Sequence, residues 1–530
     1  YKRQLQSYDQ AVASVYIAGT LAGTGTLHAP SYDLMGATIH ADLGGGVLNQ
    51  LGGITTLHGL SYATEVNLIA GTLRLGGNDR LLTSTELVIG SGVELDVQTF
   101  NQTVGSAYIA GVLSGSGTLF APGYMLEGAL INANLGDGTL QNVAGLSILN
   151  GTAGAGMVLI TAGTLQLGAA DRLSDTADLA VGTGAILDVQ DHSDTVGTAY
   201  IAGSLIGTGT LTAEVYGLQG AEISANLGSG VAEIFGGTSL LNGTMGAAEV
   251  LVSSGTLLLG ADDRLIDTAV LGIDADATFD LAGYNETIAG LLGTGAIVLG
   301  GAGDVGTLTI EAMDHSSFGG SITGTGDVVK TGDGEFELSG TSEFAGRMTV
   351  ADGLLTVNGS LLAELYVGAE GMLGGTGMIS ALTVDGYLAP GNSIGTLSIA
   401  GDLSFAAGSV YLVEVKPGLE GDRTDVGGAI TISSSASVEV LAGSGEYDPV
   451  TTYRILTAAG GIDGTFGSVT TNLAFLDPEL FYTTNAVDLV LLRNDVDFAE
   501  YAITPNQITT AGAVQELGYG NAPVSYTHLR

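Results

Sequence analysis

The stretch from Tyr16 to Leu27, YIAGTLAGTGTL, decides the fold because the chain repeats it at a fixed interval. It returns as YIAGVLSGSGTL from Tyr108 and as YIAGSLIGTGTL from Tyr200, and both intervals are 92 residues. Equal units without insertions are typical of solenoids, in which each unit stacks on its neighbour in register. The other landmarks that keep this interval are Asp79-Arg80-Leu81, Asp171-Arg172-Leu173 and Asp263-Arg264-Leu265; Asp96, Asp188 and Asp280; Tyr32, Tyr124 and Tyr216; Gly36, Gly128 and Gly220; and Leu43, Leu135 and Leu227.

The composition favours short strands joined by tight turns. The 530 residues include 87 glycines and no tryptophan, and only 6% are aromatic. Apolar and small polar residues alternate in short bursts that Gly, Asn or Asp interrupts, which is strand periodicity. We therefore expect an all-β fold, a right-handed parallel β-helix (solenoid) with a short C-terminal helix. At roughly 20 to 25 residues per coil, each 92-residue unit would form about four coils.

The charge balance excludes several kinds of partner. The chain has 55 acidic residues against 13 basic ones, for a net charge of −42. Phosphate groups and anionic membranes are bound by clusters of Lys and Arg, so we expect no nucleic acid partner and no direct membrane insertion. The absence of Cys excludes disulfides and thiolate metal sites. No apolar run is long enough to predict a membrane-spanning helix.

Two motifs that resemble catalytic or calcium sites have a structural interpretation. Gly391-Asn392-Ser393 is similar to a serine-hydrolase turn, but no motif pairs this Ser with a His and an acid, so we interpret it as a turn between coils. Gly76 to Asp79 is similar to half of a calcium-binding nonapeptide, yet its counterparts stand 92 residues apart and not nine. The repeated Asp-Arg pairs indicate a structural turn, because a single active site would not be repeated three times.

The remaining acids and histidines show no site pattern either. Asp274-Ala275-Asp276 lacks the basic neighbour of a polysaccharide-lyase site, so we interpret it as a solvated turn. The histidines do not repeat, since His28 corresponds to Phe120 and Thr212, and a metal array is not expected. We therefore expect no catalytic, cofactor-binding or metal-binding residues, no cofactor and no enzymatic activity.

The pattern changes from Gly324 onward, and this part resembles a known family. Lys330-Thr331-Gly332, Leu338-Ser339-Gly340 and Gly353-Leu354-Leu355 resemble the passenger-associated repeat of bacterial autotransporters, which are proteins of type V secretion. The segment from Leu388 to Leu397, LAPGNSIGTL, is similar to the one that introduces the C-terminal passenger region of that family. Segments similar to the family's last coils before its membrane-anchored barrel are Tyr453 to Ala458, Gly464 to Phe466 and Leu489 to Asp495.

A capping box predicts one helix near the end of the chain. Thr504 can cap it, Pro505 suits the first helical position, Gln507 completes the box, and Gly518 would end the helix near Leu517. In the family such a helix leads into a translocator barrel, which is missing from this sequence. The residues from Pro523 to Arg530 fit none of the preceding pattern and resemble the read-through of a sequencing adapter, an artefact.

These observations predict five regions. Residues 1–15 are an unassigned N-terminal fragment, 16–287 are three 92-residue β-helix units, and 288–400 are passenger-associated repeat coils. Residues 401–495 are a C-terminal cap or autochaperone region, and 496–530 are a linker helix towards the missing barrel.

The resemblance implies a structural passenger stalk. Such a stalk is exported across the outer membrane of a Gram-negative bacterium, is displayed at the cell surface, and is anchored by its own C-terminal outer-membrane barrel as partner. Residues 401–495 would then template folding during secretion. One alternative is an adhesin or self-association module that binds a host surface or the passenger of a sister cell. A third possibility is a polysaccharide-acting β-helix enzyme.

Overall fold

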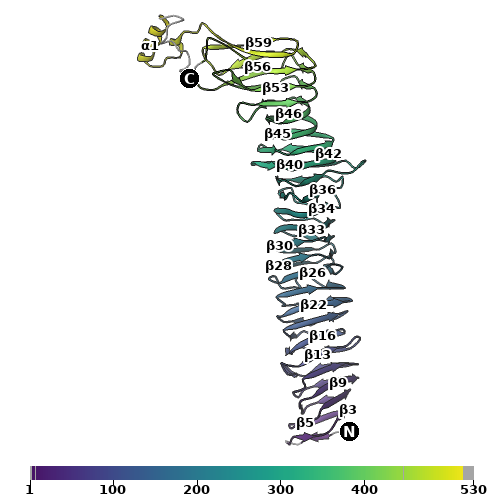
Figure 1. Cartoon of the computed structure of the whole chain (residues 1–530). Coiled ribbons are helices and arrows are strands. Elements are labelled where there is room, and N and C mark those ends of the chain that lie inside the picture. Colours follow the sequence, from purple (N-terminus) through teal and green to yellow (C-terminus); the bar gives the residue numbers. More distant parts are fainter. Residues whose placement is uncertain (1–2, 6–7, 446, 517–530) are drawn as a thin grey trace. The chain divides into compact units, whose positions relative to one another are not determined.

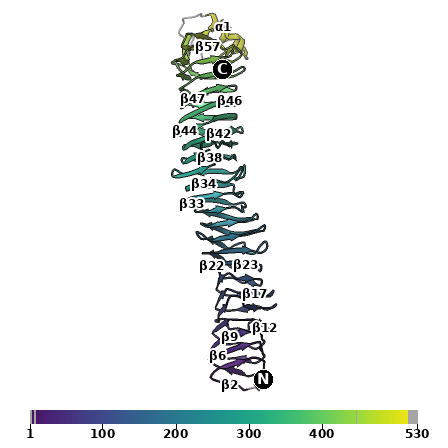
Figure 2. The same ribbon diagram turned by 90° about the vertical axis from the view of Figure 1, so that its right-hand side faces the viewer.

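The computed structural model describes residues 3–5, 8–445 and 447–516, and it confirms the predicted fold class. These residues form the turns of a β-solenoid, about 22 in all, and one short α-helix follows the last strand (Figures 1 and 2). It divides into two compact units, Tyr1–Ile266 and Asp267–Arg530, called unit 1 and unit 2 here.

Each coil of unit 1 has two long sides and one short side, and strands of successive coils pair in parallel along each side. The first side consists of β3 (Val15–Ile17), β6 (Ser31–Met35), β9 (Val47–Gly52), β11 (Glu65–Leu68), β13 (Glu86–Ile89), β16 (Ser106–Ile109), β19 (Gly123–Glu127), β22 (Thr139–Ala144), β24 (Met157–Ile160), β26 (Asp178–Val181), β28 (Ser193–Ile201), β30 (Thr210–Leu218), β33 (Val231–Leu241) and β34 (Glu249–Leu259).

The second side includes the later parts of β33 and β34. Its other strands are β1 (Arg3–Leu5), β4 (Thr20–Gly23), β7 (Thr38–Ile39), β10 (Ile54–Leu57), β12 (Thr72–Leu75), β14 (Glu94–Asp96), β17 (Val112–Ser114), β20 (Leu130–Ile131), β23 (Leu146–Leu149), β25 (Thr164–Leu167), β27 (Ile186–Asp188), β29 (Ser204–Ile206) and β31 (Glu222–Ile223).

The third side is shorter and interrupted, with single bridges such as Leu43 to Ser61 between its strands. Those strands are β2 (Gln10–Ala11), β5 (Thr26–His28), β8 (Asp42–Leu43), β15 (Gln102–Thr103), β18 (Thr118–Phe120), β21 (Asn134–Leu135) and β32 (Asn226–Leu227).

Five coils, and not the predicted four, make each 92-residue repeat. On the first side the register leads from Ile17 to Ile109 in five steps, and the same number of steps leads from Ile109 to Ile201. The prediction was wrong because the third side adds only two residues or a single bridge to many coils. The partners between Ile17 and Ile109 are Leu34, Gln50, Leu68 and Ile89.

Inward leucines and isoleucines form the core of unit 1. On the second side Leu95, Leu113, Ile131 and Leu149 lie in successive coils and are fully buried. Each such side chain contributes roughly 1.5 to 3 kcal/mol when it leaves water. Because the strands pair along the stack, the same register satisfies the backbone hydrogen bonds of the strands.

The repeated tyrosines and arginines hold the turns of unit 1. Tyr124 is buried, its hydroxyl accepts a hydrogen bond from the Ala121 amide at 2.8 Å, and it donates one to the Leu119 carbonyl at 2.9 Å. Arg172 donates to the carbonyls of Ala170 and Asn150 at 2.9 and 2.7 Å, so it joins its own turn to the preceding coil. Tyr32 and Tyr216 repeat the first arrangement, and Arg80 and Arg264 repeat the second.

Unit 2 is also built from coils, and its strands are longer, several of them turning a corner. The strands are β35 (Val270–Ile273), β36 (Ala277–Asp280), β37 (Glu286–Ile288), β38 (Gly290–Gly293), β39 (Ala296–Val298), β40 (Gly306–Glu311), β41 (Ser316–Phe318), β42 (Ser321–Thr331), β43 (Glu335–Leu338), β44 (Thr341–Ala345), β45 (Arg347–Val357), β46 (Ser360–Gly375), β47 (Met378–Val384), β48 (Tyr387–Pro390), β49 (Thr396–Ile399), β50 (Leu403–Phe405), β51 (Val410–Lys416), β52 (Glu420–Gly421), β53 (Arg423–Val426), β54 (Ile430–Ile432), β55 (Ser437–Ala442), β56 (Val450–Ala458), β57 (Ile462–Gly464), β58 (Ser468–Thr471), β59 (Leu476–Tyr482) and β60 (Ala486–Arg493).

Parallel stacking does not continue to the last strands of unit 2. β60 pairs antiparallel with both β56 and β59, and β51 pairs antiparallel with β52. The strands β59 and β60 close on each other through a hairpin instead of a further coil. This arrangement gives β56, which pairs in parallel with β53, an antiparallel partner on its other edge.

The predicted helix is present with its capping box. After the 3₁₀ helix η1 (Phe498–Tyr501), the helix α1 spans Pro505–Glu516. Gln507 accepts from the Thr504 amide at 2.9 Å, and the Thr504 hydroxyl accepts from the Gln507 amide at 3.3 Å. The predicted end at Leu517 and Gly518, and the residues 523–530, lie outside the described residues.

Candidate functional site

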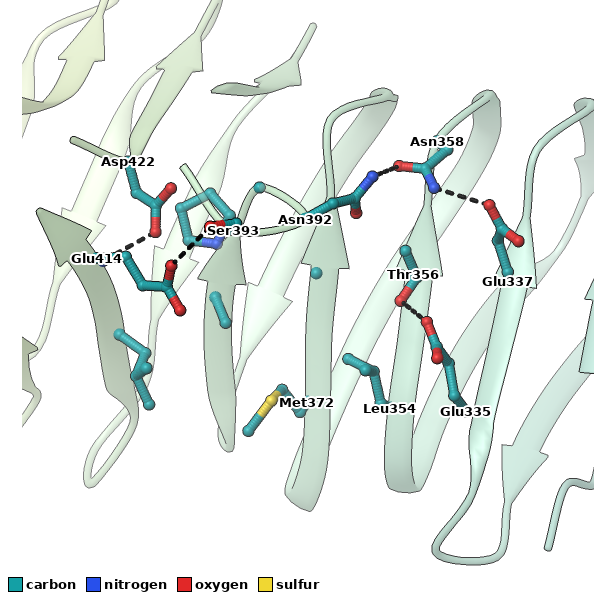
Figure 3. Close-up of a pocket in the computed structure, with 15 residues that line it drawn as sticks. Glu335, Glu337, Leu354, Thr356, Asn358, Met372, Asn392, Ser393, Glu414 and Asp422 are labelled. Carbon is teal, nitrogen blue, oxygen red and sulfur yellow. Dashed lines mark hydrogen bonds between the residues drawn. The ribbon is translucent and has the colours of Figure 1, made fainter. Parts of the chain in front are cut away.

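A groove of about 430 Å³ runs across successive coils of unit 2, and it is the candidate functional site (Figure 3). It forms because one outward register of these coils carries small residues: Thr356 pairs with Gly374, and Gly374 pairs with Ala389. The residues that line it are Glu335, Glu337, Leu354, Thr356, Asn358, Met372, Gly374, Ala389, Pro390, Gly391, Asn392, Ser393, Leu412, Glu414 and Asp422.

A hydrogen-bonded ladder of polar side chains follows one edge of the groove. The Asn392 amide donates to the Asn358 side-chain oxygen at 2.9 Å, and Asn358 donates to Glu337 at 2.8 Å (Figure 3). These hydrogen bonds and one from Ser317 favour the charged carboxylate, so they lower the pKa of Glu337. Nearby, the Thr356 hydroxyl donates to Glu335 at 2.6 Å.

The other end of the groove has a buried carboxyl group. Asp422 is only 2% exposed, and its two oxygens accept hydrogen bonds from the amides of Gly395 and Glu414, both at 2.8 Å. Burial outweighs these two hydrogen bonds and raises the pKa of Asp422 to about 7. The site therefore combines carboxyl groups that ionise at different pH with an apolar floor of Leu354, Met372 and Leu412.

The motif Gly391-Asn392-Ser393 lies between β48 and β49, where the sequence predicts a turn. Gly391 and Ser393 have φ angles of 95° and 123°, a region that favours glycine. The Ser393 hydroxyl donates to Glu414 at 3.3 Å and not to a histidine. The motif also lines the groove, which sequence reasoning missed.

The other predicted turns also lie where the sequence places them. Asp79, Asp171 and Asp263 have φ angles of 47°, 54° and 53°, so all three occupy the same left-handed turn. Asp274 and Asp276 lie in an exposed turn between β35 and β36. Within residues 3–5, 8–445 and 447–516, no three His, Asp or Glu side chains gather in a way that could hold a metal ion.

The groove carboxylates are the residues that sequence reasoning missed. Glu335 and Glu337 lie on β43, Glu414 lies on β51, and Asp422 directly precedes β53, so the four residues form no single local motif. The sequence signal for the groove is the column of small outward residues Thr356, Gly374 and Ala389. This column can be recognised only when the length of each coil is known.

Comparison with known proteins gives partial matches to exported proteins. No protein-family model matches the chain. An extracellular serine protease of Serratia marcescens is 33% identical over 152 residues, which is 27% of this chain and 14% of that protein. The adhesin BmaC autotransporter of Brucella suis biovar 1 (strain 1330) is 32% identical over 194 residues, which is 36% of this chain and 5% of that protein. The predicted resemblance to autotransporter passenger domains is confirmed.

The passenger resemblance covers a limited part of each relative. A second extracellular serine protease of Serratia marcescens is 29% identical over 147 residues, which is 26% of this chain and again 14% of the relative. The solenoid and these relatives together support a passenger domain and export to the cell exterior. No helix among the described residues combines the length and the apolar character needed to cross a membrane.

The prediction that the chain has no enzymatic activity is wrong by this comparison. Two of the three relatives are named extracellular serine proteases. The prediction considered only motifs within this chain, whereas the aligned region is 14% of each of those two relatives. The composition of a passenger solenoid says nothing about an activity that is located elsewhere in a protein.

Proposed function

We propose that this chain is part of an autotransporter stalk that is displayed at the surface of a Gram-negative cell and anchored by an outer-membrane barrel. The observation that carries the proposal is the parallel pairing of successive coils, which runs along unit 1 and through unit 2 as far as its antiparallel last strands. A coil of such a solenoid folds by adding its strands to the edge of a finished coil, which needs only a short loop closure and no nucleotide. Folding outside the cell can in this way favour outward movement of the chain.

We propose in addition that residues 401–495 start this folding. Their last coils have one edge occupied by the antiparallel strand β60, while β53 pairs in parallel with the preceding β49. Three aromatic rings pack inside this region: Phe405 lies 5.5 Å from Tyr411 and 5.1 Å from Phe466, between ring centroids. A core of this kind supports a segment that folds first and then offers a single open edge to the coils before it.

Deletion of residues 401–495 from the full-length gene tests the templating role. We expect the deletion to abolish surface display, measured by antibody labelling and protease accessibility on whole cells. Deletion of residues 108–199 is the matched control, because it removes one complete 92-residue repeat of similar length and restores the sequence YIAG at the junction. Equal display and equal protease resistance of both deletion variants would contradict the proposal.

Adhesion is a second candidate function, favoured by the similarity to the Brucella adhesin and by the groove in unit 2. Filling the groove with Gly374→Leu should then reduce binding of the purified protein to host cells or to itself. Gly156→Leu is the matched control, because a side chain at this exposed glycine would meet nothing within 4 Å. Unchanged binding of the Gly374→Leu variant would exclude the groove as the adhesive site.

Proteolysis is the candidate that the two Serratia relatives favour for the whole protein. Cells that express the full-length gene should then release an activity that degrades casein and that a serine-directed inhibitor blocks. The same assay on culture medium from cells without the gene is the control. Equal casein degradation in both media would contradict this proposal.

A further inference from the structure

Two histidine side chains stack on neighbouring coils of unit 1. His40 follows β7 and His58 follows β10, and the pairing of Ile39 with Leu57 places them side by side. Their ring centroids are 4.7 Å apart and the ring planes differ by only 3°. Both residues are exposed. The separation equals the ordinary spacing of paired strands, so the solenoid itself holds the two rings face to face.

The ring nitrogens of this pair are available to a ligand. In the described part of the chain, no hydrogen bond and no ion pair involves a ring nitrogen of His40 or His58. Arg80 donates to the backbone carbonyl of His58 at 2.8 Å and leaves the ring free. By contrast, His192 and His315 lie 3.2 and 3.1 Å from carboxylates.

The second 92-residue repeat has asparagines at the two positions that are equivalent to His40 and His58. Asn132 and Asn150 occupy the equivalent positions, and the Asn150 amide donates to the Asn132 side-chain oxygen at 2.7 Å. The His58 ring lies over Gly76, and the Asn150 side chain lies in the same way over Gly168. The coils therefore also stack with asparagines in this column, where a side-chain hydrogen bond takes the place of the stacked imidazoles.

We propose that His40 and His58 form a site for a divalent transition metal ion such as Zn²⁺, which links two successive coils. Imidazole nitrogens bind Zn²⁺ at about 2.0 to 2.1 Å, so two nitrogens on one tetrahedral ion lie about 3.4 Å apart. The rings are exposed, and a small rotation brings their edges from the stacked separation to this distance. Water fills the remaining positions, because the described residues offer no cluster of three ligands.

Titration of the full chain with ZnCl₂, followed by calorimetry, tests the site. The wild-type protein should bind one Zn²⁺ that the double variant H40N/H58N no longer binds, and the single variant His58→Asn should weaken binding at least tenfold. Protons compete for the same nitrogens, so binding should weaken as the pH is lowered. Equal affinity and stoichiometry in wild type and H40N/H58N would overturn the proposal, since the ion would then lie elsewhere in the chain.

A variant that gains a second histidine pair tests the proposal in a way that a loss of protein stability cannot imitate. N132H/N150H copies the histidine pair into the second repeat, so this variant should bind two Zn²⁺ ions per chain. Circular dichroism and thermal unfolding in EDTA check that both double variants fold as the wild type does. With Cu²⁺ as the probe, the electron paramagnetic resonance spectrum of wild type should show two nitrogen ligands. A wild-type spectrum with one nitrogen ligand, or a folded N132H/N150H variant without an added ion, would contradict the paired site.

Discussion

At the scale of single residues, the buried tyrosines show how a repeated side chain supports a turn. Replacing Tyr124 by Phe keeps the ring but leaves the Ala121 amide without this partner, whereas the Leu119 carbonyl keeps the hydrogen bond from the Gly136 amide at 2.8 Å. Unsatisfied buried groups of this kind cost about 1 to 3 kcal/mol, so we expect the free energy of unfolding to fall by that amount. Urea unfolding measures the change, and hydrogen exchange of the Ala121 amide locates it.

Tyr200, an exposed tyrosine of the repeated YIAG motif, provides the control for this prediction. Tyr200 is 39% exposed, and its hydroxyl bonds to Gln219 on the surface. Tyr200→Phe should therefore change the free energy of unfolding by less than about 0.5 kcal/mol. An equal loss in Tyr124→Phe and Tyr200→Phe would show that the buried hydroxyl has no special role.

The titration of Tyr124 adds a second residue-scale prediction. Burial raises its pKa to about 12, above the value near 10 of an unfolded chain. A raised folded pKa contributes stability below about pH 10, and that contribution is lost as the pH rises through 12. We expect wild type to lose more stability than Tyr124→Phe between pH 9 and pH 11, measured by urea unfolding. Parallel curves would contradict the assignment.

Asp422 in the groove predicts a pH dependence nearer to neutrality. Its folded pKa of about 7 lies above the value near 3.9 expected for an unfolded chain. The contribution of this group to stability is therefore complete below about pH 4 and is lost as the pH rises through 7. Urea unfolding of the groove region at several pH values should show this fall, and Asp422→Asn should remove it.

Asp402→Asn is the matched control for the groove carboxyl group. Asp402 is exposed, and it accepts one backbone hydrogen bond, from the Ala429 amide at 2.8 Å. This variant should keep the pH dependence of the wild type. If Asp422→Asn and wild type show the same slope between pH 4 and pH 7, Asp422 is not the group that titrates.

At the scale of elements, Lys330 on β42 joins the turn between β42 and β43 to β45 of the next coil. Its side chain is fully buried, and the ammonium group donates to the carbonyls of Gly332 at 2.5 Å and Asp352 at 2.8 Å. Lys330→Met keeps most of the packing but removes the hydrogen bonds to both carbonyls. We expect a loss of about 2 to 3 kcal/mol in the free energy of unfolding and faster hydrogen exchange at Leu354.

An exposed cation on β45 supplies the comparison for Lys330. Arg347 forms an exposed ion pair with Glu364 at 3.4 Å, and such pairs contribute less than about 1 kcal/mol. Arg347→Met should therefore have a small effect on the same measurements. A Lys330→Met variant as stable as Arg347→Met would contradict the role of the buried ammonium group.

Some elements could be predicted from the sequence because their signals are local. The capping box at Thr504 and Gln507 depends on four consecutive residues, and the left-handed turns at Asp79, Asp171 and Asp263 repeat in every copy. The number of coils could not be predicted, because the third side of a coil is often a single bridge that leaves no pattern. The antiparallel pairing at the end of unit 2 was not predicted, because the alternation of apolar and polar residues in a strand is the same whether the strand pairs in parallel or antiparallel.

At the scale of the whole molecule, the sequence predicts the repeat but not the groove. The 92-residue interval is a property of the chain that needs no coordinates, and it fixes which residues share a column. The groove depends on Thr356, Gly374 and Ala389 lying in one outward column, and on carboxyl groups from coils that are distant in sequence. Those neighbours follow from the length of each coil, which varies along the chain and has no sequence marker.

The repeat predicts that one complete 92-residue repeat can be deleted from unit 1 and that the shortened protein still folds. Deletion of residues 108–199 joins Ala107 to Tyr200. Ala107 is equivalent to Ala199, which precedes Tyr200 in β28, so the junction has the same sequence as the native strand. Every inward ladder then continues, because the deleted segment contains five full coils. Deletion of residues 108–198 leaves one extra residue inside the strand, which turns the inward side chains of that strand outward. We expect the first variant to keep the wild-type circular dichroism and resistance to protease, and the second to be cleaved near the junction. If both variants are cleaved alike, or neither is, the register of the repeat does not determine the fold.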